Sequence, residues 1–285
     1  MINSILKKYD RLKKINLLKE LKKSANSALH LILWSSAIAS LCGYTIRCIN
    51  NQWSWWQCLL VLLVVLIILT VLFLIKNCFT EVVCYKTEIN GKTVTIKKGD
   101  IFKEDGWKVI PFNERFDTKV DDKIIAHTTL NGIMIDSYVS DLSDLNRTIK
   151  DAQKDNSLYK PMFKNEKAVY PLGRIISYKN FLMLAFTHFD SQERAYIKVD
   201  EYEQLLFRMW VELRRVYMGK PIAIPLIGTG VTDIEGLSVK NYTELLKCIL
   251  CTFQRSSFQP VKGITIVLTE EAINKIDFTI IKDSF

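Results

Sequence analysis

The sequence predicts an α/β domain that follows a helical hairpin crossing a membrane twice. Two long apolar runs, residues 28–49 and 57–77, are separated by a short link. From residue 80 onward, short apolar runs typical of strands alternate with amphipathic segments of helical period. This alternation is typical of a layered α/β domain. The 285-residue chain leaves about 200 residues for that domain, which is enough for one full core.

Residues 1–27 predict a basic amphipathic helix. They carry eight Lys and Arg residues against Asp10 and Glu20, so most of the formal net charge of +9 lies there. Apolar residues recur between these cations at helical spacing, as in helices that lie on a membrane surface. A basic patch beside a membrane segment indicates contact with anionic lipid and a cytoplasmic N-terminus. The rest of the chain carries little net charge, so we expect no nucleic-acid partner.

Residues 28–79 form the predicted transmembrane hairpin. At about 1.5 Å per residue, both runs are long enough to cross about 30 Å of hydrocarbon. The link carries Trp53, Trp55 and Trp56, which suit a membrane–water interface. We therefore expect a two-span protein of the cell inner membrane with both termini in the cytoplasm. A cleaved signal peptide is disfavoured because the first run is long and a second span follows.

Cysteine and histidine usage predicts no metal centre. The chain has seven Cys and three His, and Cys248 and Cys251 form a C-x-x-C pair. That pair lies in a helix-like apolar run with no second pair, whereas zinc sites need closely spaced ligands in register. We expect reduced structural thiols in a cytoplasmic compartment, with no metal ion and no resident cofactor.

The α/β domain is predicted to begin with a hairpin. Residues 82–89 and 92–97 alternate like two strands around Asn90-Gly91, a preferred two-residue turn. The pattern then predicts a strand, a polar surface helix and two more strands, in the order 107–112, 141–154, 175–176 and 181–186.

The second half of the domain continues the alternation. Residues 199–218 place their apolar side chains on one helical stripe, which ends at Gly219. Residues 238–253 predict another amphipathic helix, with Ser238 as its candidate cap. A final helix-like segment closes the chain. A buried strand is predicted before each of these last two helical segments, at residues 221–227 and at residues 263–268.

Four short stretches at strand ends are candidate binding elements. They contain Asp100 after Gly99, Asn113 after an apolar strand, the "HTTLNGI" stretch of residues 127–133, and Gly228-Thr229-Gly230. In an open α/β sheet, ligands gather beyond the carboxyl ends of the strands. Each stretch also has a structural reading, as a turn or a helix cap. The dinucleotide signature G-x-G-x-x-G fails because Asp233 stands where its third glycine belongs.

Together these stretches resemble a known family. "GDIFKEDGWKVIPFN" is similar to the opening of a macro domain, and "IPLIGTG" is similar to its second phosphate loop. The order of "VIPFNERFDT", "LNG" and "PLIGTG" behind two membrane spans resembles the membrane-anchored macro-domain effectors of Thoeris anti-phage defence. This resemblance implies a macro-like three-layer α/β/α domain with a mixed sheet over residues 80–285.

The resemblance also implies which residues bind a ligand. Asp100 would accept a hydrogen bond from an adenine amino group beside Ile101, and Asn113 would face the distal ribose. A first loop would cradle the diphosphate, and a second loop would cover the phosphates and the distal ribose. Phe116 and Asp117 are assigned to the ligand's terminal group. The two loops consist of Thr129, Leu130, Asn131 and Gly132, and of Gly228, Thr229, Gly230 and Val231.

The function implied is that of a membrane-anchored sensor and effector. A partner TIR-domain enzyme would make an ADP-ribose-derived signal, with a histidine conjugate of ADP-ribose as one candidate. Binding would favour a homo-oligomer that disrupts the inner membrane and causes abortive infection. The first loop keeps one glycine, and Pro111 and Phe112 precede Asn113, which favours a non-enzymatic pocket. The alternatives are an anchored ADP-ribosyl hydrolase acting on ADP-ribose conjugates and a tethered interaction protein whose α/β domain binds no ligand.

Overall fold

The chain divides into two units, Met1–Glu81 and Val82–Phe285. The computed structural model describes residues 56, 63–64, 67–72, 84–155, 157–164, 167–190, 192, 194–230, 232–236 and 240–285. The few described residues of the first unit are helical. Among all described residues, no helix is both long and apolar enough to span a membrane. The predicted N-terminal helix and nearly all of both predicted spans lie outside the described residues.

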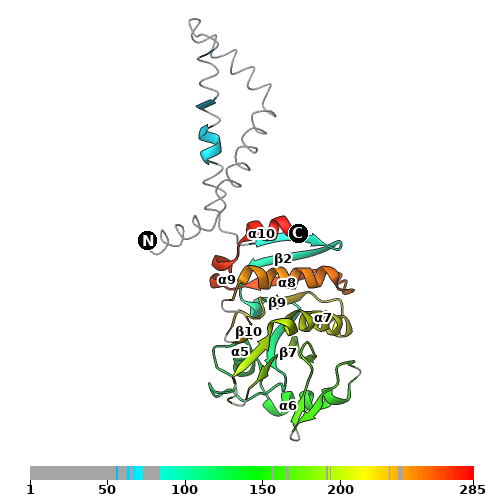
Figure 1. The fold of residues 1–285 in the computed structure, drawn as a ribbon. Helices are drawn as coiled ribbons and strands as arrows, with labels where there is room; N and C mark the ends of the chain where they lie inside the picture. The colour runs from blue at the N-terminus through cyan, green and yellow to red at the C-terminus, as the bar shows by residue number, and fades with distance from the viewer. Residues whose placement is uncertain are drawn as a thin grey trace. The chain divides into compact units, whose positions relative to one another are not determined.

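A mixed sheet forms the centre of the second unit (Figure 1). In the described part of the chain it has nine strands in the order β1-β2-β11-β9-β3-β7-β8-β10, with β6 also paired to β7. The five strands from β2 to β7 in that order run parallel. Strand β1 pairs antiparallel with β2, β6 and β8 pair antiparallel with β7, and β10 pairs parallel with β8. The strands are β1 (Cys84–Ile89), β2 (Lys92–Lys98), β3 (Trp107–Asn113), β6 (Ile175–Tyr178), β7 (Phe181–Phe189), β8 (Ala195–Lys198), β9 (Ile222–Pro225), β10 (Asp233–Glu235) and β11 (Ile264–Leu268).

Helices cover both faces of this sheet (Figure 1). One buried cluster joins the sheet to α7 (Val199–Val216), α8 (Tyr242–Arg255), α9 (Glu270–Lys275) and α10 (Phe278–Ser284). The other joins it to α5 (Leu130–Tyr138) and α6 (Leu142–Asp151). The predicted three-layer α/β/α architecture with a mixed sheet is therefore confirmed. The remaining elements are the short helices η1 (Ile101–Lys103) and η2 (Ala152–Lys154) and the hairpin β4 (Met162–Lys164) and β5 (Lys167–Val169).

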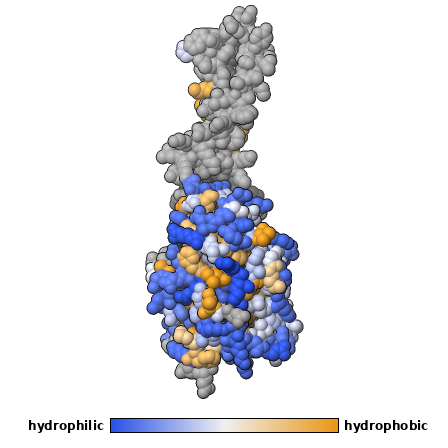
Figure 2. Space-filling model, turned by 90° about the vertical axis from the view of Figure 1, so that its right-hand side faces the viewer, coloured by the Kyte–Doolittle hydropathy of each residue, from blue (hydrophilic) through white to orange (hydrophobic). Residues whose placement is uncertain are grey.

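The central strands are apolar on both sides because both faces are covered. Val109 and Ile110 are fully buried neighbours on β3, and they belong to opposite clusters. Leu182 and Met183 divide in the same way on β7. Strands buried on both faces read as continuous apolar runs rather than as alternating ones. On the outside, Figure 2 shows a mostly polar face interrupted by separate apolar patches.

Three details of the predicted elements were wrong. Helix α8 begins at Tyr242 with Asn241 as its cap, whose side chain accepts from the N–H groups of Thr243 and Glu244. The predicted cap Ser238 lies outside the described residues. Helix α7 ends at Val216, before the predicted stop. The "LNG" stretch opens helix α5 rather than forming a loop.

Candidate functional site

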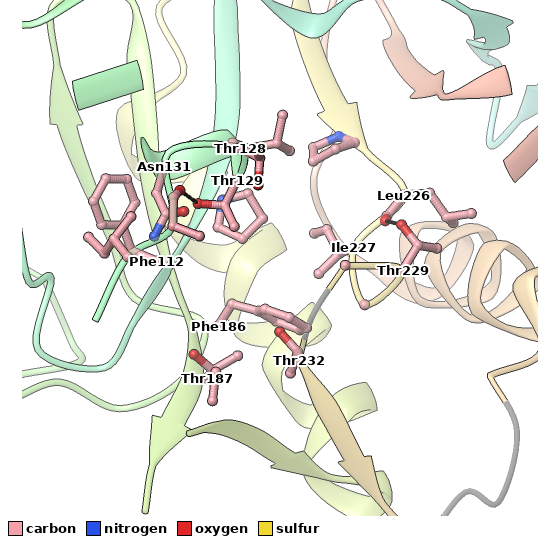
Figure 3. Close-up of a pocket in the computed structure, with 18 of the residues that line it drawn as sticks. Phe112, Thr128, Thr129, Asn131, Phe186, Thr187, Leu226, Ile227, Thr229 and Thr232 are labelled. Atoms are coloured by element: carbon pink, nitrogen blue, oxygen red, sulfur yellow. Dashed lines mark hydrogen bonds between the residues drawn. The ribbon is translucent and has the colours of Figure 1, made fainter. Parts of the chain in front are cut away.

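A cavity of about 930 Å³ lies beyond the carboxyl ends of the parallel strands. Residues at the ends of β2, β3, β7, β9 and β11 all line it. In Figure 3, Phe112 and Asn131 lie on one side, Leu226 and Thr229 lie opposite, and Thr187 lies between the two. This is the position at which open α/β sheets bind their ligands. The cavity also falls within the usual size range for small-molecule sites, about 300–1,000 Å³.

The cavity brings together most of the residues that the sequence singles out. They come from four separate stretches of the chain, and the structure gathers them at one edge of the sheet. That they bind a ligand stays a prediction. Predicted residues that line the cavity are Asp100, Ile101, Asn113, Thr129, Leu130, Asn131, Gly228, Thr229 and Gly230.

Asn113 ends strand β3, where the pairing with β7 shifts register, and only 3% of the residue is exposed. Its Oδ1 accepts hydrogen bonds from the N–H groups of Arg115 at 2.9 Å and Asp117 at 3.2 Å. Its buried Nδ2 has no partner among the described residues. A buried donor without a partner costs about 1–3 kcal/mol. The Asn113 amide is thus fixed by the turn that follows it and has donor capacity left for an acceptor in the cavity.

The second wall is the turn after strand β9. Two of its carbonyl groups accept hydrogen bonds from side chains. Thr229 Oγ1 donates to Leu226 O at 2.8 Å, and the buried Tyr202 hydroxyl donates to Ile227 O at 2.8 Å. Lys240 Nζ donates to Gly230 O at 2.6 Å. Within the described residues, no acceptor is found for the N–H groups of residues 228–230. These amides are donors for a bound anion.

The left-handed backbone of this turn falls on a glycine. Gly228 has φ of +94°, a conformation that a side chain makes unfavourable. Burial raises the pKa of Tyr202 well above its ordinary value, so its hydroxyl keeps the proton that it donates to the turn. Burial also lowers the pKa of Lys240, and the charge of Asp233 opposes this effect.

The third wall is the first turn of helix α5. Thr129 caps the helix by accepting from Gly132 N at 3.3 Å, and its hydroxyl donates to Ala126 O at 2.6 Å (Figure 3). The N–H groups of Leu130 and Asn131 belong to a first helical turn, where no intrahelical acceptor is available. The positive end of the helix dipole adds to this donor character. A helix start therefore takes the place of the predicted first loop.

Gly132 itself does not line the cavity. A Cβ built on it would lie 2.2 Å from the carbonyl oxygen of Ala126. The glycine is therefore required by the close approach of the helix to the preceding turn. This packing explains the glycine without a ligand, and the assignment of Gly132 to a phosphate cradle stays a prediction.

Asp100 both caps a short helix and lines the cavity. Its Oδ1 accepts from Phe102 N at 3.0 Å and so caps η1, and Lys103 Nζ lies 4.0 Å from its Oδ2. The carboxylate is half exposed and lines the cavity. Each carboxylate oxygen accepts more than one hydrogen bond, so the cap leaves acceptor capacity for a ligand.

Two predicted residues face away from the cavity. Phe116 is 2% exposed and packs edge-on against Tyr170, with ring centroids 5.2 Å apart. Asp117 lines a smaller pocket of about 290 Å³. Neither residue lines the main cavity, and their assignment to the ligand's terminal group stays a prediction. Val231 lies outside the described residues.

Sequence reasoning missed part of the cavity wall. The missed residues include Thr187 and Phe189 at the carboxyl end of β7, Arg194, and the carboxylates of Asp233 and Glu271. The strand-end argument would have found Thr187 and Phe189 had β7 been predicted at its full length. Arg194 lies in a loop, Asp233 in the short strand β10 and Glu271 in the short helix α9, and none of these has a periodic pattern. Among the described residues, no group of side chains is suited to hold a metal ion.

The sequence of this chain matches a known family and a known relative. The family described as "Thoeris protein ThsA, Macro domain" matches residues 94–269. Thoeris protein ThsA of Bacillus amyloliquefaciens (strain Y2) is 38% identical over 205 residues, which cover 68% of each chain.

Solved structures of the Oceanobacillus iheyensis macrodomain are also similar. A variant with ADPR is 20% identical, with a TM-score of 0.48 over 70% of this chain and 98% of that one. The macrodomain with ADP is 18% identical, with a TM-score of 0.46 over 71% and 98%.

The family match covers more than half of the chain, and the Bacillus relative is similar over two thirds of both proteins. The matched stretch runs from β2 to the end of β11 and so includes the strand ends that carry the cavity. The resemblance noted in the sequence is confirmed: this chain belongs to the macro-domain family of the Thoeris protein ThsA.

Proposed function

We propose that the cavity binds an ADP-ribose-type signalling nucleotide and that the chain is a sensor and effector of Thoeris defence. The observation that carries this proposal is the unpartnered Nδ2 of Asn113, which a ribose hydroxyl would satisfy. The family and the two walls of backbone donors agree with it.

The ligand is assigned one orientation across the cavity. Its adenine amino group donates to Asp100, in keeping with the half-exposed carboxylate there. Its diphosphate lies between the first turn of α5 and the turn of residues 228–230, because both present N–H groups. Its distal ribose reaches Asn113, and the terminal group extends toward Thr187 and Phe189.

The proposed pocket holds its ligand without turnover. Pro111 and Phe112 line the cavity next to Asn113, so bulky apolar side chains stand where a hydrolase needs room for a water molecule. Hydrolysis of ADP-ribose conjugates is the alternative that the experiment below separates.

The proposed output is at the inner membrane. In the first unit, the described side chains from Leu63 to Leu72 include six large apolar groups between 44% and 57% exposed, a composition suited to lipid. In this proposal both termini lie in the cytoplasm, where a TIR-domain enzyme would supply the signal. For the signal to drive assembly and membrane disruption, it must bind the assembled state more tightly than the resting one.

The test is a calorimetric titration of the full chain in detergent with ADP-ribose and its conjugates. The Asn113→Asp variant keeps the acceptor for Arg115 and Asp117 but replaces the unpartnered donor, so we expect affinity to fall about tenfold or more. Asn180→Asp, at the exposed β6–β7 turn, makes the same chemical change away from the cavity and should bind as the unchanged protein does.

Two results would contradict the proposal. Absence of binding by ADP-ribose and all its conjugates would exclude the ligand class. Hydrolysis of the bound conjugate during long incubation, detected by mass spectrometry, would show that the protein is a hydrolase rather than a sensor.

A further inference from the structure

The pocket that contains Asp117 is separate from the main cavity. It measures about 290 Å³ and lies between the turn after β3, helix α6 and strand β5. A water molecule occupies about 30 Å³ in the liquid, so the pocket has room for several waters or a small polyatomic ion. No residue lines both this pocket and the main cavity.

The lining of this pocket is rich in donors and in positive charge. Arg115, Lys150 and Lys167 come from three different elements, and among the described lining residues Asp117 is the one carboxylate. Thr118 Oγ1 donates to Asn146 Oδ1 at 2.9 Å, which leaves the NH₂ of Asn146 as a donor. At most one of the three cations is neutralised by Asp117, so the pocket has an excess of positive charge.

The turn that carries Arg115 is held rigidly. The N–H groups of Arg115 and Asp117 both donate to Asn113 Oδ1. Between them, Phe116 has φ of 53°, a left-handed conformation that bulky residues adopt only where their surroundings hold it. The buried Phe116 ring anchors the turn in the core against Tyr170. The backbone that presents the Arg115 guanidinium is therefore fixed before any anion arrives.

We propose that this pocket is a second binding site, for small molecules that carry a phosphate group. An arginine fork matches the oxygens of a phosphate in two parallel hydrogen bonds, and lysines add point charge. With Asp117 offsetting one of the three cations, a doubly charged phosphate matches the remaining charge, whereas chloride offers a single charge and no such geometry. This site does not depend on what fills the main cavity.

The test is binding of inorganic phosphate, pyrophosphate and glycerol phosphate to the full chain in detergent, at constant ionic strength. The probe variant is Lys150→Gln with Lys167→Gln. The control is Lys86→Gln with Lys262→Gln, which removes the same charge from exposed positions outside both pockets. We expect phosphate affinity to fall about tenfold or more in the probe and less than about twofold in the control.

Hydrogen exchange of the backbone amides shows where the anion binds. Phosphate should slow exchange of the amides of Arg115 and Asp117 in the unchanged protein and in the control, but not in the probe. Tightest binding by glycerol phosphate would identify a phosphate ester as the ligand, tightest binding by pyrophosphate a diphosphate, and tightest binding by inorganic phosphate the free ion; each of these outcomes supports the site. Affinity equal in probe and unchanged protein, or no phosphate binding at all, would overturn the proposal.

Discussion

Two glycines of the predicted binding stretches have different physical roles. Gly132 is in close contact with the backbone of Ala126, whereas no atom lies within 4 Å of a Cβ built on Gly230. Their sequence contexts, "LNG" and "GTG", look alike, and only the structure separates packing from access. A glycine in a candidate ligand loop is therefore weak evidence for a ligand until its neighbours are known.

Alanine at these two glycines tests this distinction. Gly132→Ala should lower the free energy of unfolding by about 1–3 kcal/mol, because the new methyl group meets a backbone carbonyl that cannot move freely. Gly230→Ala should change it by less than about 0.5 kcal/mol. Urea unfolding followed by circular dichroism measures both, and equal losses in the two variants would contradict the assignment.

The hydroxyl of Tyr202 is predicted to support the turn of residues 228–230. Tyr202→Phe leaves the carbonyl of Ile227 without its donor, which should cost about 1 kcal/mol of stability. Ligand affinity should fall as well, since the amides of the turn lose their fixed direction. Tyr138→Phe, a half-exposed tyrosine that stacks on Phe102, is the matched control. A Tyr202→Phe variant with unchanged ligand affinity in calorimetry would show that the turn does not depend on this bond.

At the scale of elements, a buried charge cluster joins the residues after η2 to β6 and α7. Arg174 is fully buried and donates to Glu212 and Asp155, and Glu212 also accepts from Ser157 Oγ at 2.9 Å and Arg215 Nη2 at 3.0 Å. Burial alone would raise the pKa of Glu212, but the hydrogen bonds from Arg215 and the charge of Arg174 outweigh it and lower the pKa. The cluster ties Asp155 and Ser157, which follow η2, to Arg174 before β6 and to Glu212 on α7.

Removing one charge of this cluster should be costly. Glu212→Gln leaves the buried Arg174 with Asp155 as its one remaining carboxylate partner among the described residues, and we expect a loss of about 3 kcal/mol in the free energy of unfolding. The double variant Arg174→Met with Glu212→Leu should lose less, because no charge is then left unpaired. Denaturant unfolding of the single and double variants measures the difference. A double variant less stable than Glu212→Gln would contradict this account.

His188 connects three elements and predicts a pH dependence. Its Nδ1 bonds to Glu114 at the end of β3, and its Nε2 lies 3.4 Å from Glu201 in the first turn of α7. The hydrogen bond to Glu114 raises the pKa of His188, burial opposes this, and the charges of Glu114 and Glu201 add to the rise. A raised pKa means that the stabilisation is complete below the ordinary histidine pKa and is lost as pH rises through the folded-state value.

The stability difference between the unchanged protein and His188→Gln should therefore be larger near about pH 6 than near about pH 9. Titration of every other group is common to both proteins and cancels in this difference. Unfolding free energies measured across that range give the profile, and a difference that grows with pH would refute it.

Across the molecule, the parts predicted from sequence are those with strong periodicity. The long helix α7, the apolar strand β7 and the Asn-Gly hairpin were predicted because their patterns extend over many residues. Strands β8 and β10 were missed because they have only four and three residues, too few for a periodic pattern. The strand-end argument found Asn113 at the end of β3 but not Thr187 and Phe189, because β7 was predicted too short. The sequence could not show that Phe116 and Asp117 lie outside the lining of the main cavity, because the direction of a turn depends on tertiary contacts that one sequence does not specify.

The last prediction concerns how the whole chain sits in the membrane. If residues 28–49 and 57–77 span the bilayer and both termini are cytoplasmic, the exposed Cys84 should be shielded from impermeant maleimide in spheroplasts. In a variant whose other cysteines are serine, Cys84 should react only after permeabilisation. With Cys84 also replaced, Asn51→Cys in the link should react in intact spheroplasts, because a two-span hairpin places that link outside. Labelling of Cys84 in intact spheroplasts would reverse the topology, and release of the chain by alkaline carbonate would exclude spanning altogether. A cytoplasmic Cys84 would place β1, and the domain that begins there, in the compartment where the nucleotide signal is proposed to form.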